Sequence, residues 1–329
     1  MTPLRSMTVE IQHWPLIKPF VISRGADLTA TVVVVCIEEN GVRGWGESTP
    51  YPRYSETAES VMADIEACRE AIEYDPAMTA SRLGLLGAAG NAVDCALVDL
   101  ACKLQGVRAY ELFRRPPPEA VQTTATIVLD TPAIMAADAA GYAGFPLIKL
   151  KLGTGDEDME RVKAVRRARP DARIICDANE GWSADKLDNY AGTLAKFGVE
   201  MVEQPCHADD DEGLRHLKLP ILICADESCH VAADVEGLVD KYDLINIKLD
   251  KAGGISGALE LGWAAEMHEM GVMLGCMLGT SLAMAPGVLA AQGARYVDLD
   301  GPLALTRDRQ PSLTFRDGQV FPSDPELWG

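Results

Sequence analysis

The chain has 329 residues, 48% of them hydrophobic, which is enough for one large domain and a smaller one with a full apolar core. It carries 49 acidic against 30 basic residues, a formal net charge of −19. Nucleic acids and anionic membrane surfaces require a basic face, so this charge disfavours both as partners.

The cysteines and the first residues bear on the compartment. Nine cysteines are scattered singly along the chain and form no paired metal-binding spacing. Such a pattern is typical of reduced, mostly buried thiols. The segment MTPLRSMTVEIQHW has no basic stretch followed by an apolar run and a cleavage site. Together these features predict a cytoplasmic protein.

Residues 1–115 are expected to form a mixed α+β capping domain. TVVVVCIEE and VRGWGES, joined by an Asn-Gly dipeptide, predict a β-hairpin. Residues 55–74 and 88–105 have the apolar spacing of helices. The prolines of RRPPPEA, at 114–120, cannot continue a helix and mark the end of this unit.

Strands and helices are predicted to alternate over residues 116–303. Eight apolar segments indicate strands, at 123–129, 145–152, 173–178, 199–204, 220–225, 244–248, 272–277 and 295–300. Eight such strands with helical connectors favour a closed parallel barrel over an open sheet. No convincing helix follows the eighth strand, so we expect a (β/α)7β barrel, with the tail 304–329 packing back on the capping domain.

The uncharged segment 271–294 is long enough to raise the question of a membrane span. Its glycines, Pro286 and the Thr280-Ser281 pair favour a buried strand, a turn and a buried helix instead. We therefore expect no membrane partner.

Three carboxylates each follow a short apolar run: Asp177 in IICDAN, Glu203 in MVEQP and Asp226 in ILICADES. They are spaced by about 25 residues, roughly one strand-helix repeat. The carboxyl ends of barrel strands converge, so the three acids predict a ring of oxygen ligands for a divalent cation. A purely structural ion is the alternative. Asn179 and Glu227 are candidates to orient these ligands, or else are turn or cap residues.

Lysines flank this ring in the sequence. Lys149 and Lys151 share one face of IKLKLG, and Lys248 follows the last acid in INIKLDKAGG. Adjacent positive charge lowers the pKa of an amine, as a base near neutral pH requires. The alternative is an internal ion-pair layer without chemistry. Lys251 competes with Lys248, but Lys248 lies at the strand end, whereas Lys251 is expected in a solvent-exposed loop.

Two further acids, Asp298 and Asp300 in VDLDGP, share one face at the end of the last strand. Facing an open barrel, they would attract an ammonium group. The alternative is that both cap a tight turn at Gly301-Pro302.

These residues together resemble the enolase superfamily, muconate-lactonizing-enzyme subgroup, with KxK, then Asp, Glu and Asp, then Lys on the second to sixth barrel strands. VDLDGP is similar to the dipeptide epimerase signature. Over almost its whole length the chain resembles the L-Ala-D/L-Glu epimerases of bacterial murein-peptide recycling. The motifs that carry it are FVISRG, GESTPYPRYSET, GNAVDCALVDLACK, DANEGW, VEQP, ICADESCH, INIKLDKAGG and MLGCMLGTS.

The resemblance implies a role for each site residue. The three ring carboxylates would bind Mg²⁺: Asp177, Glu203 and Asp226. Lys151 and Lys248 would be the two bases, and Lys149 would assist charge neutralisation. Asp298 would be the leading ligand of the substrate ammonium and Asp300 the second. Arg24, from the loop 16–27, would meet the carboxylate of the glutamate side chain.

The implied activity is Mg²⁺-dependent epimerisation of a small anionic dipeptide at the α-carbon of its C-terminal residue. One lysine would remove the α-proton to give an enediolate, and the opposite lysine would reprotonate the other face. N-acylamino acid racemase, o-succinylbenzoate synthase and cycloisomerase chemistry are the alternatives in the superfamily, and their substrates lack a free ammonium. A non-catalytic metal-dependent binding protein is a remote alternative that the intact lysine pair disfavours. A homo-oligomer is left open.

Overall fold

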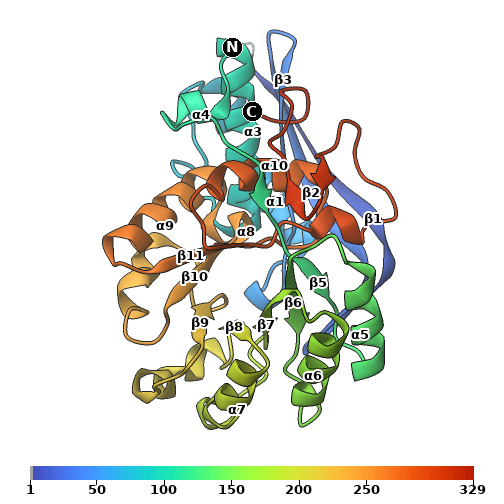
Figure 1. The fold of residues 1–329 in the computed structure, drawn as a ribbon. Coiled ribbons are helices and arrows are strands. Elements are labelled where there is room, and N and C mark those ends of the chain that lie inside the picture. The colour runs from blue at the N-terminus through green and yellow to red at the C-terminus, as the bar shows by residue number, and fades with distance from the viewer. Residues whose placement is uncertain (1–2) are drawn as a thin grey trace.

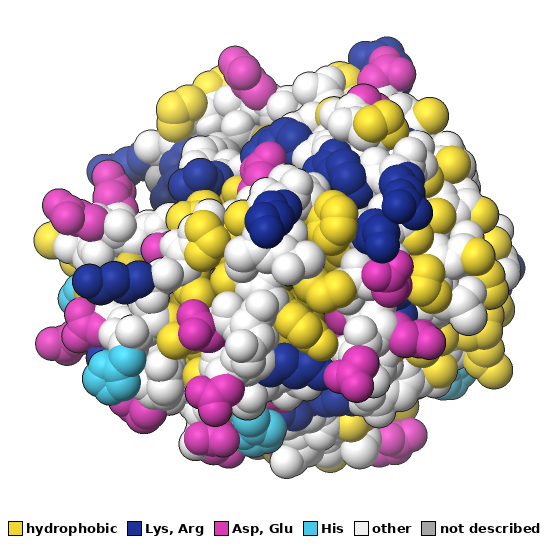
Figure 2. All heavy atoms as spheres, turned by 60° about the horizontal axis from the view of Figure 1, so that its bottom comes forward, with side chains coloured by type: hydrophobic (Ala, Val, Ile, Leu, Met, Phe, Trp, Pro, Cys, Tyr) yellow, Lys and Arg dark blue, Asp and Glu magenta, His cyan; other side chains and the backbone are white. Residues whose placement is uncertain are grey.

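The computed structural model describes residues 3–329. It has an N-terminal α+β unit, a sheet of eight parallel strands with helices around it, and a C-terminal segment that returns to the N-terminal unit (Figure 1). This arrangement confirms the predicted fold class. On the face shown in Figure 2, acidic and basic side chains are interspersed with hydrophobic ones.

The N-terminal unit is built on the antiparallel sheet β1 (Ser6–Ile22), β2 (Gly25–Glu39) and β3 (Val42–Ser48). The turn between β2 and β3 is the predicted Asn-Gly pair, with both residues at positive φ. The first strand was not predicted, although Met7, Val9 and Ile11 alternate with polar residues and pack on the core of this unit.

Helices cover one face of this sheet. They are α1 (Ala58–Ala67), α2 (Arg69–Tyr74) and α3 (Gly87–Gln105), and the short α4 (Ala109–Leu112) packs on α3. The single helix predicted at 55–74 is therefore two helices, which meet at Cys68. The long helix α3 approaches β3 closely, because a Cβ at Gly46 would lie 2.1 Å from the carbonyl oxygen of Ala92.

The eight barrel strands are hydrogen-bonded in chain order, and all are parallel. They are β5 (Ala125–Ile127), β6 (Leu147–Lys151), β7 (Arg173–Asp177), β8 (Val199–Glu203), β9 (Leu222–Ala225), β10 (Leu244–Ile247), β11 (Gly271–Leu274) and β12 (Tyr296–Val297). A hydrogen bond of 2.9 Å from Thr124 N to Val297 O joins the first strand region to the last. Each strand overlaps its predicted segment and is shorter.

The connectors differ from the expected pattern in two places. The α-helical ones are α5 (Pro132–Gly141), α6 (Asp158–Ala168), α7 (Ala184–Lys196), α8 (Leu249–Ala252), α9 (Ile255–Met267) and α10 (Ser281–Ala290). The connections after β8 and β9 contain only 3₁₀ turns, η2 (Ala208–Asp210), η3 (Glu212–His216) and η4 (Ala232–Gly237). The first of these connections holds the polar run HADDDE, which offers no apolar face for a helix to bury.

The segment 271–294 forms β11, a turn and the buried helix α10, as predicted. No helix within residues 3–329 combines the length and the apolar character that crossing a membrane requires.

The barrel interior is layered, because alternate residues of a strand share a face. Its floor is a buried apolar cluster with one member from each of seven strands: Leu147, Ile175, Met201, Cys224, Leu244, Met273 and Tyr296. Two positions further along the same strands the residues are Lys149, Asp177, Glu203, Asp226, Asn246, Gly275 and Asp298. Polar interior side chains therefore gather above an apolar floor, at the carboxyl end of the barrel.

The C-terminal segment packs on the N-terminal unit, as expected. Leu305 forms a β-bridge with Leu16, and the indole nitrogen of Trp328 donates to Cys95 O at 3.0 Å. The hairpin β13 (Phe315–Arg316) and β14 (Gln319–Val320) pairs with β4 (Val121–Gln122). The division at residues 115 and 303 stays a prediction.

Candidate active site

A cavity of about 720 Å³ lies between the carboxyl ends of the barrel strands and the N-terminal unit. Its lining combines strand-end residues, among them Lys151, Lys248, Asp298 and Asp300, with residues of the N-terminal unit, among them Arg24, Tyr51 and Arg53. This is the end of a barrel at which enzymes of this architecture bind substrates. A second hollow, lined by Leu217 and Pro220 among others, contains none of the predicted site residues.

The three predicted ring acids lie inside the barrel at the carboxyl ends of three consecutive strands. Asp177 and Glu203 are register partners on β7 and β8, and Asp226 directly follows β9. All three are fully buried. Their carboxylates project above the apolar floor because each lies two residues beyond a floor residue on its strand.

Lys149 lies among these acids. Its Nζ is 2.6 Å from Glu203 Oε2, 3.3 Å from Asp177 Oδ2 and 2.7 Å from Asp298 Oδ2. Burial by itself would lower the pKa of Lys149, but the surrounding carboxylates raise it well above the usual value. The lowering expected from two adjacent lysines is therefore not found at Lys149, because acids outnumber amines around it.

Lys151 and Lys248 both line the cavity, and each is paired with a ring acid. Lys151 Nζ donates to Asp177 Oδ2 at 2.6 Å, and Lys248 Nζ donates to Asp226 Oδ2 at 2.7 Å. Their strand positions, on β6 and directly after β10, are four strands apart in a barrel of eight. The two amines therefore stand on opposite sides of the barrel.

The expectation that Lys251 lies in a solvent-exposed loop is wrong. Helix α8 begins directly after β10 and turns Lys251 inward, so that it is only 3% exposed. Its Nζ donates to Asp226 O at 2.5 Å, to Asp226 Oδ1 at 2.7 Å and to Asn246 O at 3.0 Å. An ammonium has three donors, and all three are used. Lys251 does not line the cavity, whereas Lys248 does.

The acid ring fits a hard divalent cation by its chemistry, since it offers three buried carboxylates. Glu203 Oε2 accepts no hydrogen bond, although Lys149 Nζ is close to it. As the side chains stand, no three His, Cys, Asp or Glu groups of residues 3–329 are gathered to hold a metal ion. Lysine ammonium groups pair with the acids instead. The metal-binding role stays a prediction.

Asp298 and Asp300 reach the same cavity, but only one of them is free of strong partners. Asp298 binds Lys149 through Oδ2 and accepts from Thr124 Oγ1 at 2.6 Å through Oδ1. Asp300 accepts from Thr126 N at 2.6 Å, and its carboxyl lies beside that of Asp298. Burial and the charge of Asp298 raise the pKa of Asp300 to about 7. Both acids face the barrel interior, where Asp298 meets Lys149 and both line the cavity.

Arg24 covers the cavity from the N-terminal unit and is already paired with acids. Its guanidinium donates to Glu227 Oε1 at 2.7 Å, to Glu180 Oε2 at 3.2 Å and to Tyr51 Oη at 2.9 Å. A substrate carboxylate that binds Arg24 must therefore share it with these acids or replace one of them.

Sequence reasoning missed Arg53 and Glu180. Arg53 donates twice to Glu180, at 2.8 Å each, and so joins the same charge network beside the cavity. No signal in the sequence indicates that a loop arginine of the N-terminal unit meets an acid of the barrel. The two candidate orienting residues differ in outcome: Asn179 N donates to Asp177 Oδ1 at 2.9 Å, whereas Glu227 binds Arg24.

Two family models match the chain, one in its N-terminal part and one in the remainder. Residues 5–113 match the mandelate racemase / muconate lactonizing enzyme N-terminal domain. Residues 133–325 match the enolase C-terminal domain-like family.

Two relatives match over nearly their whole length. The L-Ala-D/L-Glu epimerase of Escherichia coli K12 is 43% identical over 324 residues, covering 96% of this chain and 99% of the relative. The N-acetyl-D-glutamate racemase of a Pseudoalteromonas species is 39% identical over 301 residues, covering 91% and 95%.

Solved structures of the same family have the same fold. An enolase family member from Agrobacterium tumefaciens, with bound sodium and L-Ala-L-Glu and an ordered loop, superposes with a TM-score of 0.96 at 46% identity, covering 99% of this chain and all of that one. A dipeptide epimerase from Enterococcus faecalis, complexed with Mg and L-Leu-L-Tyr, gives a TM-score of 0.90 at 29% identity, covering 98% of each chain.

Proposed function

The chain belongs to the mandelate racemase / muconate lactonizing enzyme group of the enolase superfamily, and from this premise we propose that it is a Mg²⁺-dependent L-Ala-D/L-Glu epimerase. At the coarser level it is an isomerase, a dipeptide epimerase of this superfamily. The preference for L-Ala-D-Glu and L-Ala-L-Glu, the mechanism and a role in cytoplasmic murein-peptide recycling are the proposal.

One observation carries the proposal: two lysines stand on opposite sides of an acid-lined cavity. Lys151 and Lys248 are held by Asp177 and Asp226, and both amines line the same space. Bases on opposite sides are what inversion at a single carbon requires, because the proton leaves one face and returns to the other. A binding protein has no need of such a pair.

The residues divide the work as follows. Lys151 and Lys248 each address one face of the substrate α-carbon, so one removes the proton and the other returns one. Lys149, buried among acids, supplies fixed positive charge beneath the reacting carboxylate. Asp177, Glu203 and Asp226 would hold Mg²⁺, and the bound ion would neutralise the negative charge that develops on the substrate carboxylate.

An acid and an arginine that line the cavity favour as substrate a dipeptide with an acidic second residue. Asp300 lines the cavity with few partners and would meet the α-ammonium of the first residue, with Asp298 behind it. Arg24 also lines the cavity, from the N-terminal unit, and would meet the distal carboxylate of glutamate. Positive groups inside the site are needed because an anionic dipeptide approaches a chain of net charge −19.

The test is proton NMR of L-Ala-L-Glu in D₂O with the protein and Mg²⁺. We expect the glutamate α-hydrogen signal to disappear by exchange while signals of the second diastereomer grow. The alanine α-hydrogen serves as the internal control and should remain. No exchange at glutamate, with Mg²⁺ bound, would contradict the proposal.

A second candidate, racemisation of an N-acylated glutamate, has one observation in its favour. Asp298 is already neutralised by Lys149, so the ammonium end of the site is less acidic than the sequence predicted. A relative that is 39% identical is named an N-acetyl-D-glutamate racemase. The same NMR experiment with N-acetyl-L-glutamate distinguishes the two: faster exchange there than in L-Ala-L-Glu favours this candidate.

A further inference from the structure

We propose that Asn246 is a positioning residue that fixes Glu203 within the acid ring, and that Gly275 is a glycine in order to leave room for it. This inference rests on the proposed function, because it assigns to the ring of Asp177, Glu203 and Asp226 the binding of a divalent cation.

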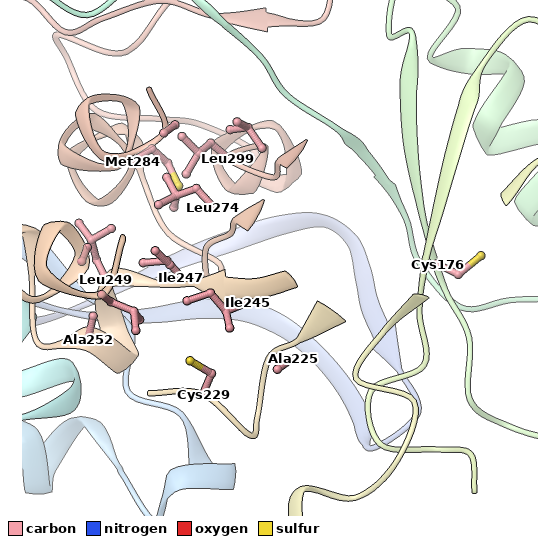
Figure 3. Packing of buried hydrophobic residues seen from close by; sticks show 14 of the residues in the cluster. Cys176, Ala225, Cys229, Ile245, Ile247, Leu249, Ala252, Leu274, Met284 and Leu299 are labelled. Carbon is pink, nitrogen blue, oxygen red and sulfur yellow. The ribbon is translucent and has the colours of Figure 1, made fainter. Parts of the chain in front are cut away.

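Asn246 belongs to the polar layer of the barrel interior. On β10 it lies two residues beyond the floor residue Leu244 and two before Lys248, so the three share the interior face. The alternate residues Ile245 and Ile247 project to the other side of the strand, toward Leu249 and Leu274 (Figure 3). Asn246 is thus placed in the ring by the same alternation that places the lysine.

The contact with Glu203 crosses the barrel interior. Asn246 Nδ2 donates to Glu203 Oε1 at 2.6 Å, although β9 lies between their strands in the sheet. Both side chains are fully buried. Among residues 3–329 this is the one hydrogen bond that the Glu203 carboxylate accepts, since Oε2 accepts none.

A neutral amide suits this position chemically. It restrains the rotation of the carboxylate by holding one oxygen, and it leaves the other oxygen toward the centre of the ring. It also adds no charge. An ammonium in its place would compete with a cation for Glu203, as Lys149 does on the other oxygen.

Gly275 gives independent support. It directly follows the neighbouring strand β11, two residues beyond the floor residue Met273, so it lies on the interior face. A Cβ there would lie 2.6 Å from Asn246 Oδ1 and 2.7 Å from Asn246 Nδ2. Its backbone is not in the left-handed region, so conformation does not demand glycine here. The demand is for space, and the atoms that need the space are those of the amide that holds Glu203.

The experiment measures the dissociation constant for Mg²⁺ by calorimetry on the full-length chain and on four variants. Asn246→Ala removes the amide, Gly275→Ala displaces it, and the double variant combines the two. Gly262→Ala is the matched control, because the nearest atom to a Cβ there is Ile247 Cδ1 at 3.8 Å. Circular dichroism and the Tm without metal report on folding.

We expect Asn246→Ala and Gly275→Ala each to weaken Mg²⁺ binding by about 10–100-fold, the usual effect of losing a partner of a metal ligand. In the double variant Gly275→Ala should add little, because the group that it displaces is gone. Dipeptide turnover should recover toward the unsubstituted rate when Mg²⁺ is raised, which a merely structural defect would not allow. Gly262→Ala should bind Mg²⁺ normally.

The outcomes separate this inference from the proposed function. Unchanged Mg²⁺ affinity in Asn246→Ala overturns the inference alone; if that variant does not fold, unchanged affinity in Gly275→Ala does so. Full additivity in the double variant overturns the role of Gly275. Weakened Mg²⁺ binding as expected, with no dipeptide epimerised by the unsubstituted protein, overturns only the proposed function. No Mg²⁺ binding by the unsubstituted protein overturns both.

Discussion

Lys149 Nζ lies 2.7 Å from Asp298 Oδ2, and both side chains are buried inside the barrel. This pair changes the expected division of work between the two acids of VDLDGP. Asp298 is a counterion within the barrel, whereas Asp300 lines the cavity and accepts from Thr126 N, so we propose that Asp300 is the first to meet a substrate ammonium.

We therefore predict different phenotypes for Asp298→Asn and Asp300→Asn. Removing one partner of a buried ion pair costs about 3–5 kcal/mol, so Asp298→Asn should lower the Tm as well as kcat/KM for every dipeptide. Asp300→Asn keeps an acceptor for Thr126 N, so it should raise KM for dipeptides with little change in Tm. Thermal unfolding and steady-state kinetics check this, and equal Tm losses would contradict it.

The opposed lysines give a second prediction. Each amine addresses one face of the α-carbon, so Lys151→Ala and Lys248→Ala should each abolish epimerisation. Any residual α-hydrogen exchange in D₂O should concern one epimer in the first variant and the other epimer in the second. Exchange of the same epimer in both variants would refute the assignment, as would a Lys248→Ala enzyme that still epimerises.

The acid ring gives a prediction on metal dependence. Treatment with EDTA should abolish turnover, and added Mg²⁺ should restore it, because carboxylate oxygens are ligands that Mg²⁺ prefers. Glu203→Gln should leave the fold intact and abolish turnover at ordinary Mg²⁺ concentrations. Full activity after exhaustive EDTA treatment would show that the ring is not a metal site.

Arg24 allows a prediction on specificity. A charge-assisted contact in a closed pocket contributes about 1.5–3 kcal/mol, so Arg24→Ala should lower kcat/KM for Glu-ended dipeptides by about one to two orders of magnitude. A Leu-ended dipeptide should be barely affected. Arg53→Ala is the control for loss of the charge network beside the cavity, since Arg53 holds Glu180 as Arg24 does but does not bind Glu227. Equal losses for both substrates in Arg24→Ala would mean that Arg24 only holds Glu227 and Glu180 in place and does not read the substrate side chain.

A pH prediction follows from Asp250, which accepts from Thr49 N and Asn91 Nδ2, both at 2.8 Å, and so ties α8 to the N-terminal unit. Burial raises the pKa of Asp250 to about 7, above its value of about 3.9 in an unfolded chain. The folded protein therefore retains a proton that the unfolded chain loses, and this contribution to stability is lost as pH rises from about 4 to about 7.

Asp250→Asn removes that pH-dependent contribution while keeping an acceptor for both donors. The Tm of the variant should rise relative to the unsubstituted protein as pH increases through this range, and the difference should level off above about pH 7. Asp188→Asn, an exposed residue of α7, is the control and should show no such trend. A Tm difference independent of pH would contradict the protonated state of Asp250.

The order of the barrel strands and the interior position of the acids could be predicted from the sequence. The alternation of side chains along a strand and the pairing of successive strands both depend on residues that are close in the sequence. They suffice to bring Asp177, Glu203 and Asp226 to the carboxyl end of the barrel. The opposition of Lys151 and Lys248 follows from the same count of strands. The strand β1 carried a readable alternation that was missed.

Only the tertiary structure decided the contacts between segments far apart in the chain. Arg24 and Glu227 are 203 residues apart, and Arg53 and Glu180 are 127 apart, so their pairing depends on how the N-terminal unit sits on the barrel. The inward turn of Lys251 depends on where α8 begins, and the capture of Asp298 by Lys149 depends on the closure of the barrel. Local residue patterns encode which face a side chain occupies, but the partner that it meets there is set by the packing of the whole chain.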